Sequence, residues 1–166
     1  MINLKKLGFL EIIVFFSALD VLSTLIWTAS TRSAVEERAN IVKDNHKTIV
    51  DFVNNQINSC STGGNNTKTS WGELCNDTWT SNKIISYINS NLNLKNPYSK
   101  DSLIVKSAQD PRIQAEGKAG QSTEMGIIFI SSNDFESAPG SELIIGTCVK
   151  SPCVAAGNNE LTSVYR

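Results

Sequence analysis

The chain contains 166 residues, with 15 Lys and Arg against 16 Asp and Glu, so its formal net charge is −1. This balance excludes the strongly basic surface of a dedicated nucleic-acid-binding protein. The single histidine, His46, excludes a His-rich metal site and most Ser-His-Asp or Cys-His catalytic schemes. We therefore expect one small domain that is not an enzyme and uses no cofactor or metal.

The N-terminal segment is uneven in hydrophobicity. Residues 1–8 read MINLKKLG and carry only the charges of Lys5 and Lys6, whereas residues 9–29 are almost entirely apolar. As a helix these apolar residues cover about 30 Å, which is enough to cross a bilayer. By the positive-inside rule the two lysines keep their end in the cytoplasm, so the larger C-terminal part is exported.

Two acidic residues interrupt the apolar stretch. A carboxylate near a bilayer centre costs about 2.5–3.5 kcal/mol, and Glu11 and Asp20 are spaced so that they project from opposite faces of a helix. A plain single-span anchor does not shelter both, but a helix surrounded by other protein helices does. A cleaved secretory signal is disfavoured, because no small-residue cleavage site leads into a turn.

Beyond residue 30 the pattern becomes amphipathic. Apolar positions recur at steps of three or four and form one stripe of helical period: Val35, Ala39, Val42, His46, Ile49, Val53 and Ile57. Neither Pro nor Gly occurs between Gly8 and Gly63, so the pattern predicts one helix from Phe9 to about Asn58. Its second half, residues 30–58, is expected to pack on the chain's own domain, with His46 buried.

These features together resemble a type IV pilin or a related pseudopilin: a short leader ending in Lys-Lys-Leu-Gly, then a phenylalanine, then an apolar helix with an early glutamate. The resemblance implies that a prepilin peptidase cuts after Gly8 and that Phe9 becomes the methylated N-terminus. It also implies that Glu11 neutralises the N-terminal amine of a neighbouring subunit. An ion pair of this kind is tolerable in an apolar core.

The expected function is therefore that of a structural subunit in a helical filament of identical copies at the cell surface. Glu11 and Asp20 are the expected assembly residues, and the unassembled subunit is held in the inner membrane. The resemblance further implies partners in an assembly ATPase and a platform protein, and roles in adhesion, motility or DNA uptake. Two alternatives remain: a pseudopilin of a secretion or DNA-uptake machine, and a single-span membrane-anchored extracellular binding domain.

Residues 59–166 read as a head domain. We expect a polar surface connection at 61–82 and a short helix at 83–91 with its isoleucines inward. Short apolar runs predict strands at 103–105, 125–130, 143–149 and 161–165, and turn residues between the second and third runs predict an antiparallel hairpin. The carboxylates Asp110, Glu116 and Glu124 are placed in a polar loop. The expected fold class is α+β, with the long helix packed on a small antiparallel sheet.

Four cysteines in an exported chain favour two disulfides. Sequence order suggests the pairs Cys60–Cys75 and Cys148–Cys153, while the two other connectivities remain open; type IV pilins are similar in often closing a C-terminal loop with a disulfide. The cysteine spacing does not fit a metal site. Trp71, Trp79 and Tyr87 lie near Lys68 and Lys83 in sequence, and we favour buried aromatics over a ligand-stacking surface.

Overall fold

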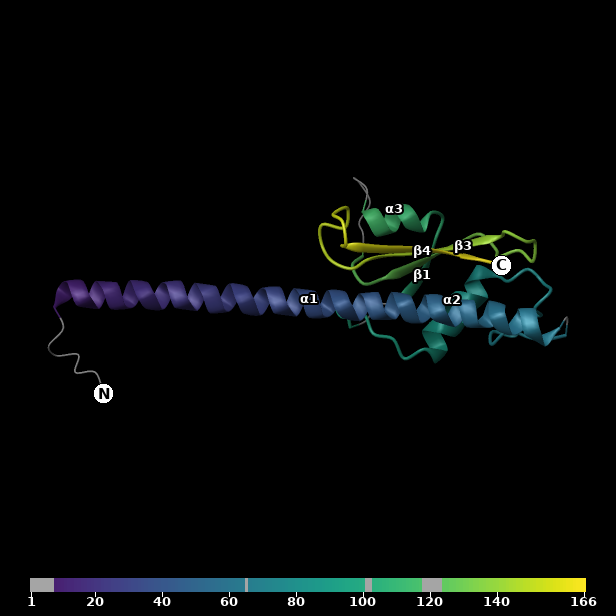
Figure 1. The fold of residues 1–166 in the computed structure, drawn as a ribbon, viewed down its shortest axis with the longest axis horizontal. Coiled ribbons are helices and arrows are strands. Elements are labelled where there is room, and N and C mark those ends of the chain that lie inside the picture. The colour runs from purple at the N-terminus through teal and green to yellow at the C-terminus, as the bar shows by residue number, and fades with distance from the viewer. Residues whose placement is uncertain (1–7, 65, 101–102, 118–123) are drawn as a thin grey trace. The chain divides into compact units, whose positions relative to one another are not determined.

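The computed structural model describes residues 8–64, 66–100, 103–117 and 124–166, and it has an α+β fold (Figure 1). The chain divides into two compact units, one up to Glu37 and one from Arg38 to Arg166. The expected leader, residues 1–8, lies outside the described part except for Gly8. The elements, in chain order, are α1 (Phe9–Gly63), α2 (Ser81–Asn91), β1 (Val105–Ala108), α3 (Pro111–Glu116), β2 (Ile128–Ser131), β3 (Glu142–Cys148) and β4 (Asn159–Tyr165).

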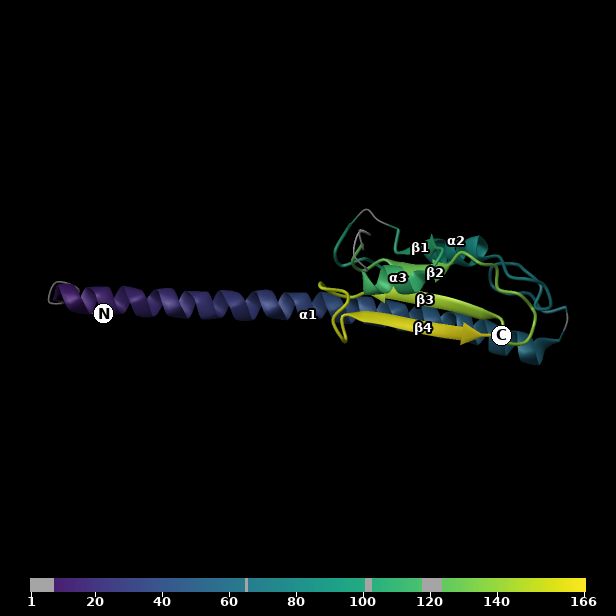
Figure 2. The ribbon, with the colours of Figure 1, turned by 90° about the horizontal axis from the view of Figure 1, so that it is seen from above.

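The four strands form one mixed sheet in the order β1-β2-β3-β4 (Figure 2). The predicted hairpin is confirmed: β2 and β3 pair antiparallel, with Ile128 opposite Thr147. β3 and β4 are also antiparallel, with Leu143 opposite Val164. β2 is buried along its whole length, as expected for a central strand with both faces covered.

The first strand differs from the antiparallel sheet that we expected, because β1 runs parallel to β2 with Val105 opposite Ile128. A parallel pair needs a crossover connection, and α3 lies in that crossover. Asp110 caps α3 by accepting a hydrogen bond from the Arg112 backbone N–H at 3.0 Å. The polar loop that we predicted around Asp110 and Glu116 is thus wrong at this point: Asp110 caps a short helix, and Glu116 is the last residue of that helix.

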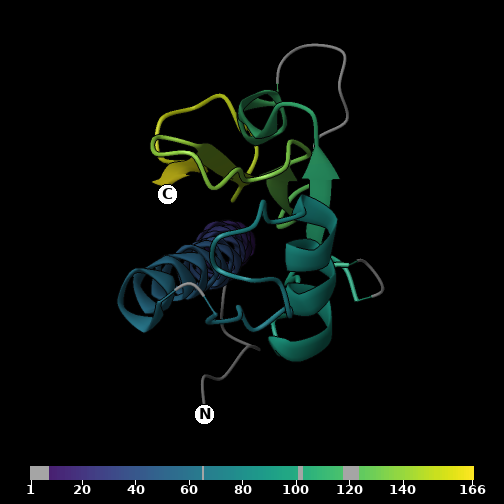
Figure 3. The same ribbon diagram turned by 90° about the vertical axis from the view of Figure 1, so that its right-hand side faces the viewer.

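The head has three layers. Figure 3 shows α3 on one face of the sheet, and α2 beside the C-terminal part of α1 on the other face. α3 packs so closely on β3 that a side chain at Gly146 has no room, since a Cβ there would lie 2.7 Å from the Pro111 carbonyl oxygen. The main core lies on the opposite face, between the sheet and the two longer helices.

The apolar stripe of α1 forms the helix's contribution to that core. Val42, Ile49 and Val53 are completely buried and Ala39 nearly so, whereas Val35 is exposed. Ile49 and Val53 pack with the inward isoleucines of α2 and with apolar residues of the sheet. The predicted packing stripe is therefore confirmed from Ala39 to Val53, and α1 continues five residues beyond the expected end at Asn58.

Replacement of Ile49 by alanine should lower the free energy of unfolding by about 2–5 kcal/mol, because it leaves a cavity among fully buried side chains. The matched control is Ile41→Ala on the same helix, where the side chain is 40% exposed and the cost should be about 0.5 kcal/mol. Urea unfolding of the detergent-solubilised chain, followed by near-UV circular dichroism, measures both. Equal losses would contradict the assigned packing face.

Candidate functional site

The part of α1 that belongs to the first unit presents large apolar side chains on all sides. Its exposed large hydrophobic residues follow one another too closely to lie on a single face: Ile13, Val14, Phe15, Phe16, Leu19, Val21, Leu22, Leu25, Ile26 and Trp27. Ile26 and Trp27 are 70% and 73% exposed. By length and composition α1 is apolar enough to cross a membrane.

Exposure of these side chains to water carries too high a free-energy cost to be stable. Burying one large apolar side chain is worth about 1.5–3 kcal/mol, so ten of them represent more than the roughly 5–15 kcal/mol that stabilises an ordinary domain. Surfaces of this size mark a membrane or protein interaction site. The segment therefore requires an apolar environment that the described chain does not itself supply.

Hydroxyl groups in this segment are bonded to the helix's own backbone. Ser17 donates to the Val14 carbonyl oxygen at 2.9 Å, and Thr24 donates to that of Val21 at 2.8 Å. Three further hydroxyls, those of Ser23, Thr28 and Thr31, donate to carbonyls three or four residues earlier. Since an unpaired donor is expensive in an apolar medium, these bonds suit the helix to such a medium.

The predicted processing and assembly residues lie just before α1 or in its N-terminal part. Gly8 is exposed and precedes α1, and Phe9 is its first residue. Glu11 lies in the first turn, but the side chains of residues 9–12 fall outside the described part. Asp20 is exposed, and its carboxylate has no ion-pair partner among the described residues.

His46 is buried as predicted, at 4% exposure, and lies where α1 crosses β4. Its Nε2 is 2.9 Å from the Thr162 hydroxyl, while its buried Nδ1 has no hydrogen-bond partner. Burial lowers the pKa of His46 to about 4, and the nearby charge of Glu160 opposes this only in part. The imidazole is therefore a neutral core group at pH 7, and no group of metal-ligating side chains forms among the described residues.

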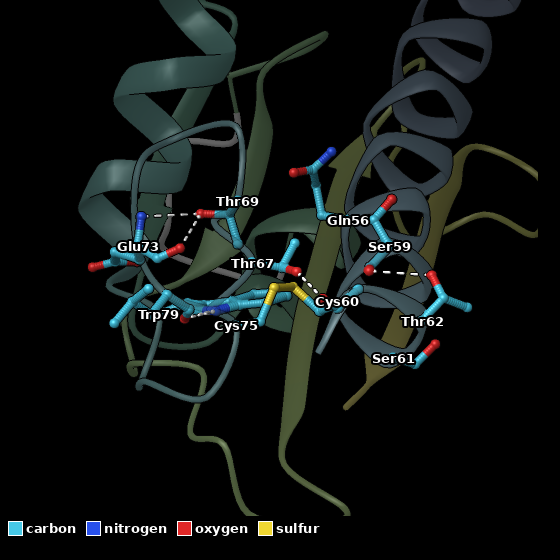
Figure 4. The surroundings of a disulfide bond; sticks show 12 residues. Gln56, Ser59, Cys60, Ser61, Thr62, Thr67, Thr69, Glu73, Cys75 and Trp79 are labelled. Carbon is cyan, nitrogen blue, oxygen red and sulfur yellow. Dashed lines mark hydrogen bonds between the residues drawn. A yellow bond between two sulfur atoms is a disulfide. The ribbon is translucent and has the colours of Figure 1, made fainter. Parts of the chain in front are cut away.

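The bond between Cys60 and Cys75 ties the last turns of α1 to the segment that follows it (Figure 4). Next to this bond the Gln56 side chain accepts the Ser70 backbone N–H at 2.8 Å. We expected 61–82 to be a surface connection, and this was wrong for its second part: Trp79 is completely buried and belongs to the core.

Glu73 is the polar centre of this segment and is only 9% exposed. Its carboxylate accepts the Trp71 indole N–H at 2.9 Å and both the backbone N–H and the hydroxyl of Thr80, each at 2.9 Å. The Lys83 Nζ lies 3.0 Å from the same carboxylate and forms an ion pair with it. Burial by itself raises the pKa of Glu73, but the hydrogen bonds from Lys83 and Thr80 outweigh it and hold the pKa below its ordinary value.

Arg166 fixes the same segment from the other end of the described chain. Its guanidinium lies 4.0 Å from the centre of the Trp79 ring, within cation–π range. It also donates to the carbonyl oxygens of Asp77, at 2.7 Å, and of Cys75. Sequence reasoning singled out neither Glu73 nor Arg166, because their partners come together only in the folded chain.

The second disulfide joins Cys148, at the end of β3, to Cys153 in the loop leading to β4. The loop is fixed further by the Asn159 side chain, which donates to the Cys153 carbonyl oxygen at 2.6 Å. Both disulfides follow the pairing that sequence order suggests, and no described cysteine is free.

No family model, curated protein or solved structure matches this chain. The apolar helix and the two disulfides are consistent with a membrane-anchored protein whose head lies outside the cytoplasm.

The burial of His46 makes stability depend on pH. Above pH 6.5 the imidazole is neutral in both the folded and unfolded chain; between pH 6.5 and about 4 the unfolded chain binds a proton that the folded chain does not. Stability from this residue should therefore be lost as the pH falls through that window, by up to about 3 kcal/mol. His46→Gln, which stays neutral, should flatten the dependence in urea unfolding between pH 6.5 and 4.5. An unchanged slope in the variant would argue against a buried neutral imidazole.

The two disulfides should differ in their contribution to stability because they close loops of different length. Cys60 and Cys75 are separated by 15 residues and Cys148 and Cys153 by 5. Loop-closure entropy then assigns about 3 kcal/mol to the first bond and about 2 kcal/mol to the second. Paired Cys→Ser variants, compared by denaturant unfolding without reductant, should show the larger loss for the first pair. The reverse order would contradict the entropic assignment.

Proposed function

We propose that this chain is a structural subunit of a type IV pilin-like filament, held in a membrane before assembly through its apolar helix half. The observation that carries the proposal is the all-round exposure of the large apolar side chains between Ile13 and Trp27. Side chains that point in every direction need neighbours on every side. A central bundle of identical helices provides them, and burial at about 25 cal/mol per Å² drives assembly.

Asp20 favours a protein environment over a permanent lipid one. A membrane anchor exposed to lipid gains nothing from a carboxylate at this depth, and inserting one costs about 2.5–3.5 kcal/mol. Among other helices the same carboxylate finds donors and water. The same reasoning applies to Glu11, which in a pilin-like filament pairs with the amine of a neighbouring Phe9.

The spacing of these two residues differs from the pilin pattern. The family glutamate lies four residues after the mature phenylalanine, whereas Glu11 lies two after Phe9. The mature N-terminus is therefore the quantity to measure. Intact cells are sheared, and the released material is examined by electron microscopy and by mass spectrometry. We expect filaments built from a chain that begins at methylated Phe9.

Substitution separates the assembly role from simple anchoring. Glu11→Leu should reduce sheared filaments more than about tenfold, since breaking a buried charge pair costs about 3–5 kcal/mol. Asp20→Leu should also reduce them, because it removes the hydrogen bonds that this carboxylate makes with neighbouring helices in the proposed filament. Ser23→Ala is the matched control in the same helix: it removes only a hydroxyl bonded to its own backbone and should leave filament yield close to wild type.

Three results would contradict the proposal in whole or in part. Filaments at normal yield in the Glu11→Leu variant would contradict the proposed ion pair between Glu11 and the neighbouring N-terminal amine. A chain that retains Met1, stays in the membrane pellet and tolerates both acidic substitutions would instead identify an anchored extracellular domain. Low abundance with correct processing but without long filaments would identify the pseudopilin alternative.

A further inference from the structure

A groove on the head lies between α2 and the aromatic residue Trp71. Trp71, Tyr87, Asn82, Ser86 and Ser90 all line it, and its volume is about 420 Å³. The groove is shallow and open to solvent rather than enclosed. All lining residues belong to the second unit, so the groove is a feature of the head alone. We refer to it as the α2 groove.

The aromatic wall of the α2 groove is supported from within. Tyr87 stacks on Phe52 of α1, with ring centres 5.7 Å apart and planes at 6°. Trp71 is held edge-on by Trp79, with ring centres 5.0 Å apart, and by Phe52 at 6.1 Å. The two groove-lining rings are therefore fixed in place by aromatic side chains of the core, and they are only partly buried themselves.

Trp71 offers the groove apolar ring surface rather than a hydrogen-bond donor. Its indole N–H is already donated to the Glu73 carboxylate at 2.9 Å. What remains is a rigid π surface whose face carries partial negative charge. Weakly positive C–H groups pack well on such a surface.

Beside Tyr87, α2 also presents a row of uncharged polar side chains to the groove. Asn82, Ser86 and Ser90 follow one another at intervals of four residues and lie on the exposed face of α2. In the part of the chain that the structure describes, these three side chains have no hydrogen-bond partner. By contrast, Thr48 and Ser59 on α1 donate to their own helix backbone. The α2 groove thus displays a row of amide and hydroxyl groups with donors and acceptors still available.

The charge of the groove is balanced. Among the described residues that line it, Lys83 is the only ionic one, and its Nζ lies 3.0 Å from the Glu73 carboxylate. The described lining therefore holds no unpaired cation to attract a phosphate or sulfate chain, and no unpaired carboxylate to attract a cation. A ligand that complements this site carries hydroxyl groups and C–H faces but no charge.

We propose that the α2 groove binds a neutral oligosaccharide. One sugar ring packs its C–H face on Tyr87, and its hydroxyls bond to Asn82, Ser86 and Ser90. Trp71, whose plane is steeply inclined to that of Tyr87, contacts the edge of this ring or the next sugar. This role does not depend on filament assembly, since every residue involved lies in the head. It adds a recognition function to the head.

The test uses the full chain, labelled with ¹⁵N, in lauryldimethylamine oxide micelles, because this detergent carries no sugar. The chain has three tryptophans, and their indole N–H signals report separately on Trp27, Trp71 and Trp79. The probes are lactose, maltotriose, cellotriose and N,N′-diacetylchitobiose at millimolar concentration, with heparin as a polyanion. We expect at least one neutral probe to shift the Trp71 signal and to leave those of Trp27 and Trp79 in place.

A double substitution on the exposed face of α2 then locates the site. Asn82→Ala/Ser86→Ala removes two hydrogen-bonding groups and should weaken binding about tenfold, as measured by the dissociation constant of the best probe. Asn55→Ala/Ser59→Ala, with the same residue types and spacing on the exposed face of α1, should change it less than about twofold. Chemical shifts of the remaining amides verify that both variants fold.

Three results would overturn the proposal. One is the absence of any Trp71 shift with all four neutral probes. Another is a Trp71 shift produced by heparin alone, which would make the groove a polyanion site. The third is equal affinity in the two double variants, which would place sugar binding elsewhere on the chain.

Discussion

The head depends on one contact above all: the buried stripe of α1, from Ala39 to Val53, against the sheet and α2. A four-stranded sheet with α3 on one face leaves its other face apolar and open. α2 covers part of that face, and the α1 stripe covers the rest (Figure 3). Because the helix period sets which side chains point inward, consecutive residues of α1 differ sharply in burial: Val42 is completely buried, whereas Ile41 is 40% exposed.

Polar groups complete the head where apolar packing ends. The segment between α1 and α2 contributes Trp79 to the core, and it stays in place through the Cys60–Cys75 bond, the Glu73 carboxylate and the Arg166 guanidinium. The disulfide, the Glu73 hydrogen bonds and the Arg166 contacts hold different parts of this segment. The buried Glu73 carboxylate and the half-buried Arg166 guanidinium each make several hydrogen bonds, which is the condition under which burial of a charge is tolerable.

Much of this architecture could be predicted from the sequence, because it rests on local periodicity. The α1 stripe, the inward isoleucines of α2 and the antiparallel pairing of β2 with β3 all follow from apolar spacing and turn residues. α3 was missed although Asp110, Pro111 and Gly117 are ordinary helix-boundary residues, since six residues are too few to show a helical period. The parallel direction of β1 was missed for the same reason, because α3 forms part of the crossover that a parallel pair requires. The contact between Arg166 and Cys75 spans 91 residues, and no local pattern can indicate it.

The internal hydrogen bonds of the apolar helix half have a thermodynamic consequence. Hydroxyls that already donate to backbone carbonyls, such as those of Ser17 and Thr24, require nothing from their surroundings. Exchange of lipid tails for the side chains of other helices then breaks none of these bonds and replaces one apolar contact with another. The free energy of this part of the helix therefore depends little on whether lipid tails or other helices surround it. A carboxylate such as that of Asp20, by contrast, is more stable among other helices than among lipid tails.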